Sequence, residues 1–267
     1  SGARATVAPA QIGAYNRVRF ALPDPLPTVS IIIPTKNGVS LLRRCIASIV
    51  EKSTYPNLDI LVVDNGSDDP ATLSYLDELQ AADTARVLRY DAPFNYSRLN
   101  NFAAEQAQGE FLLLLNNDTE VISPDWIEEL VGWGSQPWVG TVGCMLLYHD
   151  HTVQHAGITL GIGGVAGHFD RGLPDDSPGA FGRLALAHCV DGNTGACLLV
   201  RRQLYLELGG LNEEALAVAF NDVDFGLRIS EHGLRNVWTP FARLYHHESK
   251  TRGYEDTPQK RERFATE

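Results

Sequence analysis

Acidic and imidazole side chains stand where the sequence pattern changes from one predicted element to the next. A carboxylate and an imidazole together can hold Mg²⁺ or Mn²⁺ when phosphate oxygens of a substrate complete the coordination shell. An aspartate can also accept a proton from a hydroxyl, because its reference pKa of about 3.9 keeps it ionised at neutral pH. The side chains placed for this chemistry are Asp118, Asp222, Asp224, His246 and His247.

Each of these positions also has a structural explanation. Asn116–Asp118 can form a turn after a strand, since Asn and Asp are common turn residues. Asp222 can stabilise the N-terminus of a helix, and the two histidines can form hydrogen bonds at the surface. These explanations stay open for each residue taken alone, so the elements that carry the residues must decide between them.

The apolar run Phe111–Leu115 is the element around which the chain is organised. An unbroken apolar run indicates a strand buried on both faces, as in the middle of a parallel sheet. Val29–Ile33 and Ile60–Val63 have the same character, and a polar turn follows each of the three runs. We therefore predict three neighbouring strands near the centre of a mainly parallel sheet, with polar ends that line one crevice.

Helical patterns alternate with these strands in the first half of the chain. The further predicted elements are a helix with Leu42, Cys45, Ile46, Ile49 and Val50 at helical spacing, a helix with Leu73, Leu76 and Leu79 on one stripe, a strand over Arg86–Tyr90 and a helix over Tyr96–Ala107. Such alternation predicts an α/β fold with right-handed crossovers and helices on both faces of a mostly parallel central sheet.

The second half is predicted to share this sheet. Its predicted helices cover Pro124–Gly134 with Ser123 as cap, Leu204–Leu208, and Asp222–His232 with Asn221 as cap and with Val223, Leu227 and Ile229 facing inward. Its predicted strands cover Val139–Leu147, Thr194–Val200, Asn236–Trp238 and Ala242–Tyr245. Gly157–Gly167 indicates a hairpin or a flexible loop, and Phe169–Arg183 a mobile loop. We predict an N-terminal arm or linker over 1–28, one domain over 29–253 and a charged tail over 254–267.

The composition is that of an ordinary globular protein and argues against several partners. The 267 residues include 22 basic and 33 acidic side chains, a net charge of −11, which argues against a nucleic-acid backbone as partner. We recognise no transmembrane segment and no signal peptide, so we expect a cytoplasmic protein and leave open peripheral attachment at the inner face of a membrane. The cysteines have no metal-binding spacing and are expected to be buried free thiols, namely Cys45, Cys144, Cys189 and Cys197.

Several widespread catalytic signatures are missing from the sequence. It contains no Gly-x-x-x-x-Gly-Lys-Ser/Thr phosphate loop, no Gly-x-Gly-x-x-Gly after the first predicted buried strand, no Gly-x-Ser-x-Gly elbow and no His-Glu-x-x-His pattern. This argues against a P-loop ATPase, a dinucleotide-binding enzyme, an α/β-hydrolase and a zinc protease of that type.

Five motifs occur in an order that resembles a known family. They are Val29–Asn37, Val62–Asp68, Gly109–Glu120, Thr194–Cys197 and Asn221–Arg228. Together they are similar to the family-2 glycosyltransferases, which have the GT-A fold, and within them to the rhamnosyltransferase-like members that build bacterial surface polysaccharides. The resemblance covers about Val29 to Gly253.

The resemblance implies roles for the acidic residues. The Asp-x-Asp motif of the family maps onto Asn116–Asp118, so Asp118 is expected to hold the metal, and Asn116 replaces the first acid of the motif. A histidine near the end of the fold often completes the metal site, and His246 is expected to do so, with His247 as the alternative. The family's Glu-Asp pair maps onto Asn221–Asp222, so Asp222 is expected to be the catalytic base.

The resemblance also implies a set of binding residues. Those expected around the nucleotide are Pro34, Thr35, Asn37, Asp64, Asn65, Asn101, Asn116, Asn117, Lys250 and Arg252. Those expected around the donor sugar or the acceptor are Thr194, Gly195, Ala196 and Asn221. Two segments, 163–183 and 249–253, are expected to become ordered when the donor binds, because lids exclude water from such sites.

An inverting glycosyltransferase is the activity that the resemblance implies. The expected partners are a UDP-, dTDP- or GDP-linked sugar as donor and a glycan or lipid-linked glycan as acceptor, with Mn²⁺ or Mg²⁺ as cofactor and further domains of a longer protein left open. A non-catalytic binding module of a larger polymerase stays an alternative, which the two Asn replacements favour. A sugar nucleotidyltransferase is a second alternative, although the loop Thr35–Gly38 is poor in the glycine and basic residues that a triphosphate needs.

Overall fold

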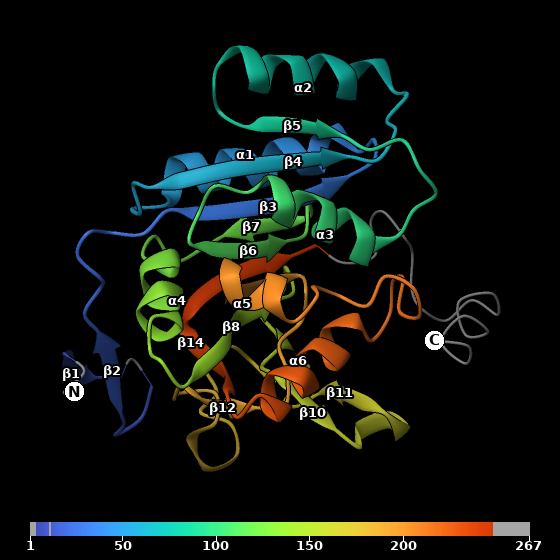
Figure 1. Ribbon diagram of the computed structural model, residues 1–267. Coiled ribbons are helices and arrows are strands. Elements are labelled where there is room, and N and C mark those ends of the chain that lie inside the picture. Colours follow the sequence, from blue (N-terminus) through green and yellow to red (C-terminus); the bar gives the residue numbers. More distant parts are fainter. Residues whose placement is uncertain (1–3, 11, 248–267) are drawn as a thin grey trace.

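A ten-stranded sheet forms the centre of the molecule. The computed structural model describes residues 4–10 and 12–247. Within these residues, hydrogen-bonded neighbours in the sheet follow the order β12–β14–β8–β13–β6–β3–β4–β5, with β7 beside β14 and β9 beside β8 (Figure 1). The strands are β3 Val29–Thr35, β4 Leu58–Asp64, β5 Arg86–Arg89, β6 Phe111–Leu115, β7 Thr119–Val121, β8 Val139–Leu147, β9 Val153–His155, β12 His188–Val190, β13 Cys197–Arg201 and β14 Arg235–His246.

Most strands of this sheet run in one direction. β5, β4, β3 and β6 are parallel neighbours, and β8 and β14 are parallel to each other. β13 is antiparallel to both β6 and β8, so these two strands also share a direction. The predicted mostly parallel sheet is therefore confirmed, and β3, β4 and β6 are the neighbouring central strands that the three apolar runs predicted.

Helices cover both faces of the sheet. They are α1 Val39–Lys52, α2 Pro70–Ala81, α3 Tyr96–Gln106, α4 Trp126–Gly134, α5 Arg202–Glu207 and α6 Asn221–Glu231. Alternate residues of β3 serve the two faces: Ile31 and Ile33 belong to the core with α1, α2 and α4, whereas Ile32 belongs to the core with α3, α5 and α6. Figure 1 shows α3, α5 and α6 in front of the sheet and α1 behind it. This double burial explains the unbroken apolar runs.

Several predicted helix details are wrong. α4 begins at Trp126 after Asp125, and Ser123 contributes its backbone carbonyl, which accepts a hydrogen bond from Trp126 N at 3.2 Å, rather than a side-chain cap. α6 begins one residue early, at Asn221, after Phe220 in the left-handed region with φ 55°. Leu227 is 41% exposed, and α6 buries Phe225 with Ile229 instead.

Local periodicity misplaced some other side chains, because it does not show which part of a helix other elements cover. Leu73 and Val50 are exposed, although both were predicted to lie on apolar helix faces. Tyr75 joins Leu76 and Leu79 in the core. Cys189 is an exposed thiol, which contradicts the expectation of burial, whereas the other three cysteines are buried.

Two predicted short strands are one long strand. β14 continues from Arg235 to His246, and its pairing with β8 shifts register between Thr239 and Arg243. Pro240, which has no N–H to donate, lies within this irregularity. The continuous strand carries His246 to the edge of the sheet, where it pairs with Thr119 of β7.

Two hairpins lie outside the sheet. β1 Ala5–Pro9 pairs with β2 Asn16–Phe20 in the segment predicted as an arm without assigned strands. β10 Ile158–Leu160 pairs with β11 Ala166–His168, which confirms a hairpin within the glycine-rich stretch. Two short 3₁₀ helices, η1 Ile162–Gly164 and η2 Ala180–Gly182, complete the described elements.

A buried carboxylate attaches the N-terminal hairpin to the domain. Glu129 of α4 is 2% exposed and its Oε2 lies 2.7 Å from Arg17 Nη2 of β2. Its Oε1 accepts hydrogen bonds from Trp133 Nε1 at 3.0 Å and from Thr239 Oγ1 at 2.9 Å. The guanidinium of Arg17 also lies over the ring of Phe241, 4.5 Å from its centroid. The carboxylate of Glu129 therefore connects α4 with β2 and β14.

We predict that Glu129→Ala destabilises the domain by about 3–5 kcal/mol, because it leaves the buried Thr239 hydroxyl and the Trp133 N–H without their acceptor. It also removes the shorter of the two carboxylate contacts of the partly buried Arg17, whose other contact is Asp125 at 3.5 Å. The measurement is chemical denaturation followed by circular dichroism. Arg19→Ala is the matched control. Among the described residues, the exposed Arg19 forms an ion pair with Asp125 alone, at 3.1 Å, and such pairs contribute about 0–1 kcal/mol. Equal effects of the two substitutions would contradict the assignment.

Candidate active site

Polar side chains from several strand ends meet at one edge of the sheet. Thr35 ends β3, Asp64 ends β4, Asn116–Asp118 follow β6, and His246 ends β14. These four strands run in the same direction, so their carboxyl ends share one edge, where open α/β sheets bind ligands. β6 is buried along its whole length, and polar residues begin only at Asn116.

Asp118 and His246 lie side by side at this edge. Asp118 Oδ1 is 3.2 Å from His246 Nε2, and both side chains are at least 90% buried. Asn116 Nδ2 is 3.2 Å from the same imidazole nitrogen. His247 Nε2 instead lies 3.3 Å from Glu120 Oε2. His246, rather than the alternative His247, is therefore the histidine that faces Asp118.

This pair fits two positions in the coordination shell of a divalent cation. Two ligands about 2.1 Å from one octahedral ion, at right angles to each other, are about 3.0 Å apart. The 3.2 Å between Asp118 Oδ1 and His246 Nε2 is close to that separation. Among the residues that the structure describes, no group of three or more His, Cys, Asp or Glu side chains is placed to hold a metal.

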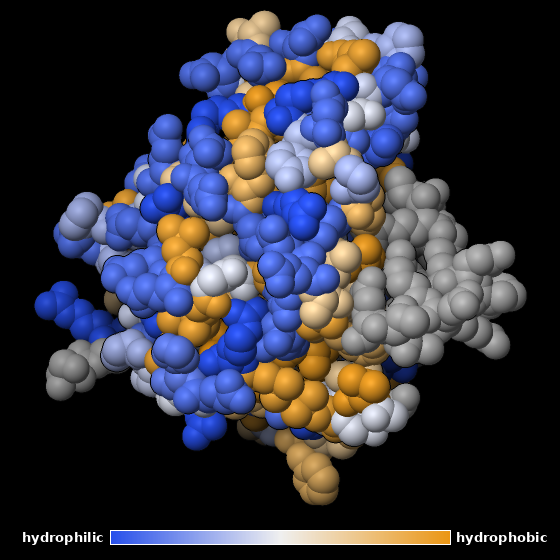
Figure 2. All heavy atoms as spheres, turned by 45° about the vertical axis from the view of Figure 1, so that its right-hand side comes forward, coloured by the Kyte–Doolittle hydropathy of each residue, from blue (hydrophilic) through white to orange (hydrophobic). Residues whose placement is uncertain are grey.

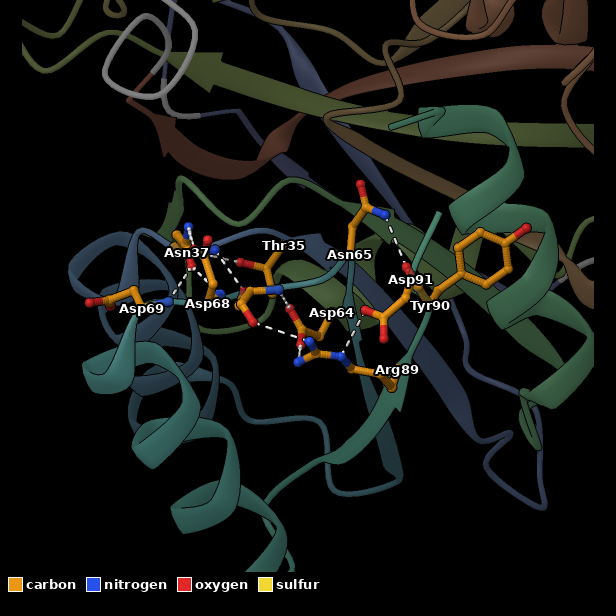
Figure 3. Close-up of polar contacts among 10 residues, drawn as sticks. Thr35, Asn37, Asp64, Asn65, Asp68, Asp69, Arg89, Tyr90 and Asp91 are labelled. Atoms are coloured by element: carbon orange, nitrogen blue, oxygen red, sulfur yellow. Dashed lines mark hydrogen bonds and ion pairs between the residues drawn. The ribbon is translucent and has the colours of Figure 1, made fainter. Parts of the chain in front are cut away.

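An ion pair fixes the end of β4. Asp64 is fully buried, and its Oδ2 contacts the guanidinium of Arg89 while its Oδ1 accepts a hydrogen bond from Ser67 N at 3.0 Å (Figure 3). Arg89 Nε also lies 2.9 Å from Asp91 Oδ1. The contacts hold the Asp64–Ser67 turn rigidly beside the strand ends. Sequence reasoning missed Arg89, because a charged residue in a short strand gives no signal of a partner in another strand.

The amides of Asn37 and Asn65 join neighbouring loops near the ends of β4 and β5 (Figure 3). Asn37 Oδ1 accepts hydrogen bonds from Asp68 N at 3.1 Å and Asp69 N at 3.0 Å. Asn65 Nδ2 donates to the carbonyl oxygens of Tyr90 and Ala92, at 3.0 and 2.8 Å. Asn65 Oδ1 is thereby left as a buried acceptor without a hydrogen-bond partner in the described part of the chain.

The other residues expected around the nucleotide do not all lie at this edge. Asn117 Nδ2 donates to Thr35 Oγ1 at 2.9 Å, and the half-buried Pro34 pairs with Val63, so all three expected residues lie at this edge of the sheet. Asn101 does not point there: its amide is engaged by Tyr205, Leu211 and Glu213 in the segment around and after α5. Asn101 Oδ1 accepts hydrogen bonds from Tyr205 Oη and Leu211 N. Asn101 Nδ2 donates to Leu211 O and to Glu213 Oε2. Lys250, Arg252 and the segment 249–253 lie outside the described residues.

Asp222 reaches the site from the start of α6. Its Oδ2 accepts a hydrogen bond from Gly195 N at 3.0 Å. Burial raises the pKa of Asp222, and the Gly195 N–H and the nearby His168 partly offset this rise. Gly195 belongs to the Thr194–Ala196 segment, and Ala196 O accepts a hydrogen bond from Asn116 N at 3.1 Å. One short segment therefore connects Asp222 with the Asp118 side of the site.

Two other carboxylates near Asp222, Asp191 and Asp224, have contacts of their own. Asp191 Oδ2 accepts a hydrogen bond from Leu160 N at 2.9 Å, and Asp224 pairs with Arg228 at 2.7 Å. Asn221 is 3% exposed, and its Nδ2 donates to Ser97 Oγ at 3.0 Å. The structure thus places Asn221 against α3, beneath the site rather than on its surface.

A histidine pair that the sequence did not reveal lies on the Asp222 side. His155 Nδ1 is 2.8 Å from His168 Nδ1, so one ring donates and the other accepts. His155 is 1% exposed, and burial lowers its pKa well below the usual value, which keeps this ring neutral at physiological pH. The two residues come from β9 and from the end of β11, and no sequence spacing indicates that these strands meet.

A family model matches the part of the chain that carries this geometry. The model described as glycosyl transferase family 2 matches residues 30–208. The chain belongs to this family. The matched range contains three of the strand ends just described, those of β3, β4 and β6, together with the Thr194–Ala196 segment. The expected family is therefore confirmed from the part of the chain that carries most of the site.

Relatives extend the match beyond residue 208. The O-antigen biosynthesis protein RfbC of Myxococcus xanthus is 42% identical over 91% of this chain, and this chain spans 19% of that protein. The N-acetylglucosaminyl-diphospho-decaprenol L-rhamnosyltransferase of Mycobacterium tuberculosis is 26% identical over 86% of this chain and 78% of its own length. Both names agree with the predicted branch of surface-polysaccharide enzymes.

A solved structure supports the fold assignment. The crystal structure of GalNAc-T7 with UDP, GalNAc and Mn²⁺ superposes with a TM-score of 0.71 at 18% identity, over 88% of this chain and 45% of that one. The predicted GT-A fold is thereby confirmed.

The surface of the described part is mixed in character. Figure 2 shows hydrophilic residues over much of one face, with hydrophobic residues in patches between them. Within the described residues, none of the helices combines the length and the apolar character that a membrane crossing requires.

We predict that Asp222→Asn changes the pH dependence of stability with a defined sign. The folded-state pKa of Asp222 is raised by burial, so folding favours its protonated form, and the stability this gives is lost as pH rises through the folded pKa. The stability of the wild type minus that of the variant should therefore fall as pH rises above about 4, the ordinary pKa of an aspartate in the unfolded chain. Denaturation curves across this range measure it, and a difference that grows with pH would contradict the assignment.

Proposed function

We propose that this domain is an inverting glycosyltransferase that moves a sugar from a nucleoside-diphosphate donor to a hydroxyl of a glycan or lipid-linked glycan. The observation that carries the proposal is the link between two half-sites. Asp118 and His246 form one half, Asp222 forms the other, and Gly195–Ala196 is hydrogen-bonded to both sides. A base on one side and a diphosphate site on the other are what an in-line displacement requires.

The donor and acceptor classes rest on what the relatives are named for. An O-antigen biosynthesis protein and a rhamnosyltransferase that acts on a diphospho-decaprenol carrier point to bacterial surface polysaccharide. The structural neighbour contains UDP and Mn²⁺. We therefore propose a UDP-, dTDP- or GDP-linked sugar as the donor, and further domains of a longer protein as partners, since this chain spans 27% and 19% of two of its relatives.

Asp118 and His246 would hold the divalent cation, Mn²⁺ or Mg²⁺. When bound, such a cation neutralises the charge that develops on the departing diphosphate. Asn116 and Asn117, beside these ligands, can donate amide N–H groups to phosphate oxygens. Thr35 and the Asp64–Asn65 turn are hydrogen-bonded to each other at the same edge and would contact the nucleoside.

Asp222 would act as the base toward the acceptor hydroxyl. A hydroxyl becomes an effective nucleophile only when its proton is removed as the new bond forms. Burial raises the affinity of Asp222 for that proton, while the Gly195 N–H keeps the carboxylate oriented. Attack from the Asp222 side, opposite the diphosphate, inverts the configuration at the anomeric carbon.

A non-catalytic binding module is the alternative that a specific observation favours, because Asn116 and Asn221 stand where the family has acids. Against it, Asp118, His246 and Asp222 are all present, and the two proposed half-sites are connected. Catalytic turnover by the isolated domain would decide between the two functions.

Asp118→Ala should abolish the metal dependence of nucleotide binding, because it removes the carboxylate of a two-residue cation site. Calorimetry with a nucleoside diphosphate, with and without Mn²⁺, measures this. Wild-type protein should bind more tightly with the cation, whereas the variant should bind equally with and without it. Unchanged Mn²⁺ dependence in the variant would exclude Asp118 as a ligand.

Asp222→Asn should lower turnover by about 10²–10⁴, because it keeps the shape of the side chain and removes the proton acceptor. Binding of nucleotide and Mn²⁺ should stay normal. Nucleoside-diphosphate release in the presence of acceptor measures turnover, and Asp224→Asn serves as the comparison, since Asp224 is paired with Arg228. Near-normal turnover in Asp222→Asn, with a loss in Asp224→Asn, would transfer the role to Asp224.

A further inference from the structure

We infer that Gln154 is a positioning residue that holds His246 in the one tautomer able to bind a cation together with Asp118. The inference rests on the proposed function, because it concerns the proposed cation site. Gln154 lies outside all five motifs that indicated the family, on the short strand β9. It is 4% exposed and contacts His246 at two points.

The two contacts define which end of the carboxamide faces the ring. Gln154 Nε2 lies 3.4 Å from the carbonyl oxygen of His246, to which only an N–H can donate. Gln154 Oε1 is therefore the atom that lies 2.6 Å from His246 Nδ1. A carbonyl oxygen accepts and never donates, so the proton of a neutral His246 ring must be on Nδ1.

The consequence is a lone pair on His246 Nε2. Asn116 Nδ2, an N–H donor 3.2 Å away, is compatible with that lone pair. Asp118 Oδ1, also 3.2 Å away, is an acceptor, so two electron-rich atoms converge with no proton of the neutral ring between them. A divalent cation relieves this repulsion, and metal-bound histidines are commonly oriented by a hydrogen bond at the other ring nitrogen.

An irregularity in the sheet gives Gln154 its place. In the antiparallel pairing of β9 with β8, Val153 is opposite Leu147 and His155 is opposite Leu146. Two successive residues of β8 thus face residues of β9 that are two apart, and Gln154 is the extra residue of a bulge. Bulges redirect side chains and are frequent beside active sites. A regular strand would align Gln154 with a residue of β8.

The experiment compares Gln154→Met, Gln154→Glu and Gln136→Met. Methionine has a similar length and cannot accept the Nδ1 proton, whereas glutamate can. Gln136 is also buried, at 8% exposure, and its Nε2 donates to the Gly132 carbonyl beside α4, so Gln136→Met is the matched control. Mn²⁺ affinity is measured by electron paramagnetic resonance with a nucleoside diphosphate present. The tautomer is read from the ¹⁵N shifts of His246 in metal-free protein.

We expect Gln154→Met to weaken Mn²⁺ binding by about 10–100-fold, and Gln154→Glu and Gln136→Met to stay within about threefold of the wild type. The ¹⁵N shifts should show the proton on Nδ1 in the wild type and in Gln154→Glu, and a mixture in Gln154→Met. A purely structural role predicts a lower melting temperature with the tautomer unchanged.

Two results would overturn the inference: wild-type Mn²⁺ affinity in Gln154→Met, or a wild-type His246 protonated on Nε2. If Gln154→Met does not fold, the ¹⁵N shifts of wild-type His246 and the Mn²⁺ affinity of Gln154→Glu still test the inference. Wild-type protein that binds no Mn²⁺ would overturn the proposed cation site itself, and the shifts would then show separately whether Gln154 sets the tautomer.

Discussion

Burial of β6 on both faces is the constraint on which the rest of the structure depends. All five of its residues are buried, and neighbouring strands on each side use its backbone groups. An unpaired polar group in such a strand would cost about 1–3 kcal/mol of stability. The polar side chains of the candidate site therefore lie where the strand leaves the core. Asn116–Asp118 are the first of these, and β3 and β4 obey the same rule at Thr35 and Asp64.

Deviations from regular pairing bring the remaining side chains to that edge. The register of β14 against β8 shifts around Pro240, and the strand still continues to His246. The bulge of β9 places Gln154 against the same histidine. These features interrupt the backbone hydrogen bonds between the strands locally. They also place polar side chains next to both ring nitrogens of His246. The regular half of the sheet thus carries Thr35, Asp64 and Asn116–Asp118, whereas the irregular half carries the imidazole.

The sequence predicted what depends on neighbouring residues. Apolar runs identified β3, β4 and β6, because strands buried on both faces are mostly apolar. The buried polar side chain of β3, Ser30, has its hydroxyl bonded to Asp59 at 2.7 Å. The same reasoning could not show that Asn236–Trp238 and Ala242–Tyr245 are one strand, since the bridging residues look like a turn. It also missed the N-terminal hairpin, whose docking depends on Arg17 meeting Glu129 from 112 residues away. In the site, Asp118 and His246 came from the family resemblance, whereas Gln154, Arg89 and the His155–His168 pair depend on contacts between distant strands.

The replacement at Asn221 is compatible with an ionised base. Asn221 is buried, and its Nδ2 donates to Ser97 Oγ and to Val218 O. A glutamate cannot donate to that carbonyl, and its charge beside Asp222 would raise the pKa of Asp222 further, since like charges disfavour each other's ionisation. A neutral residue leaves burial as the main cause of the raised pKa, opposed by the Gly195 N–H. The loss of the family's glutamate therefore removes an obstacle to Asp222 ionisation, which weakens the view that this replacement marks a domain that has lost catalysis.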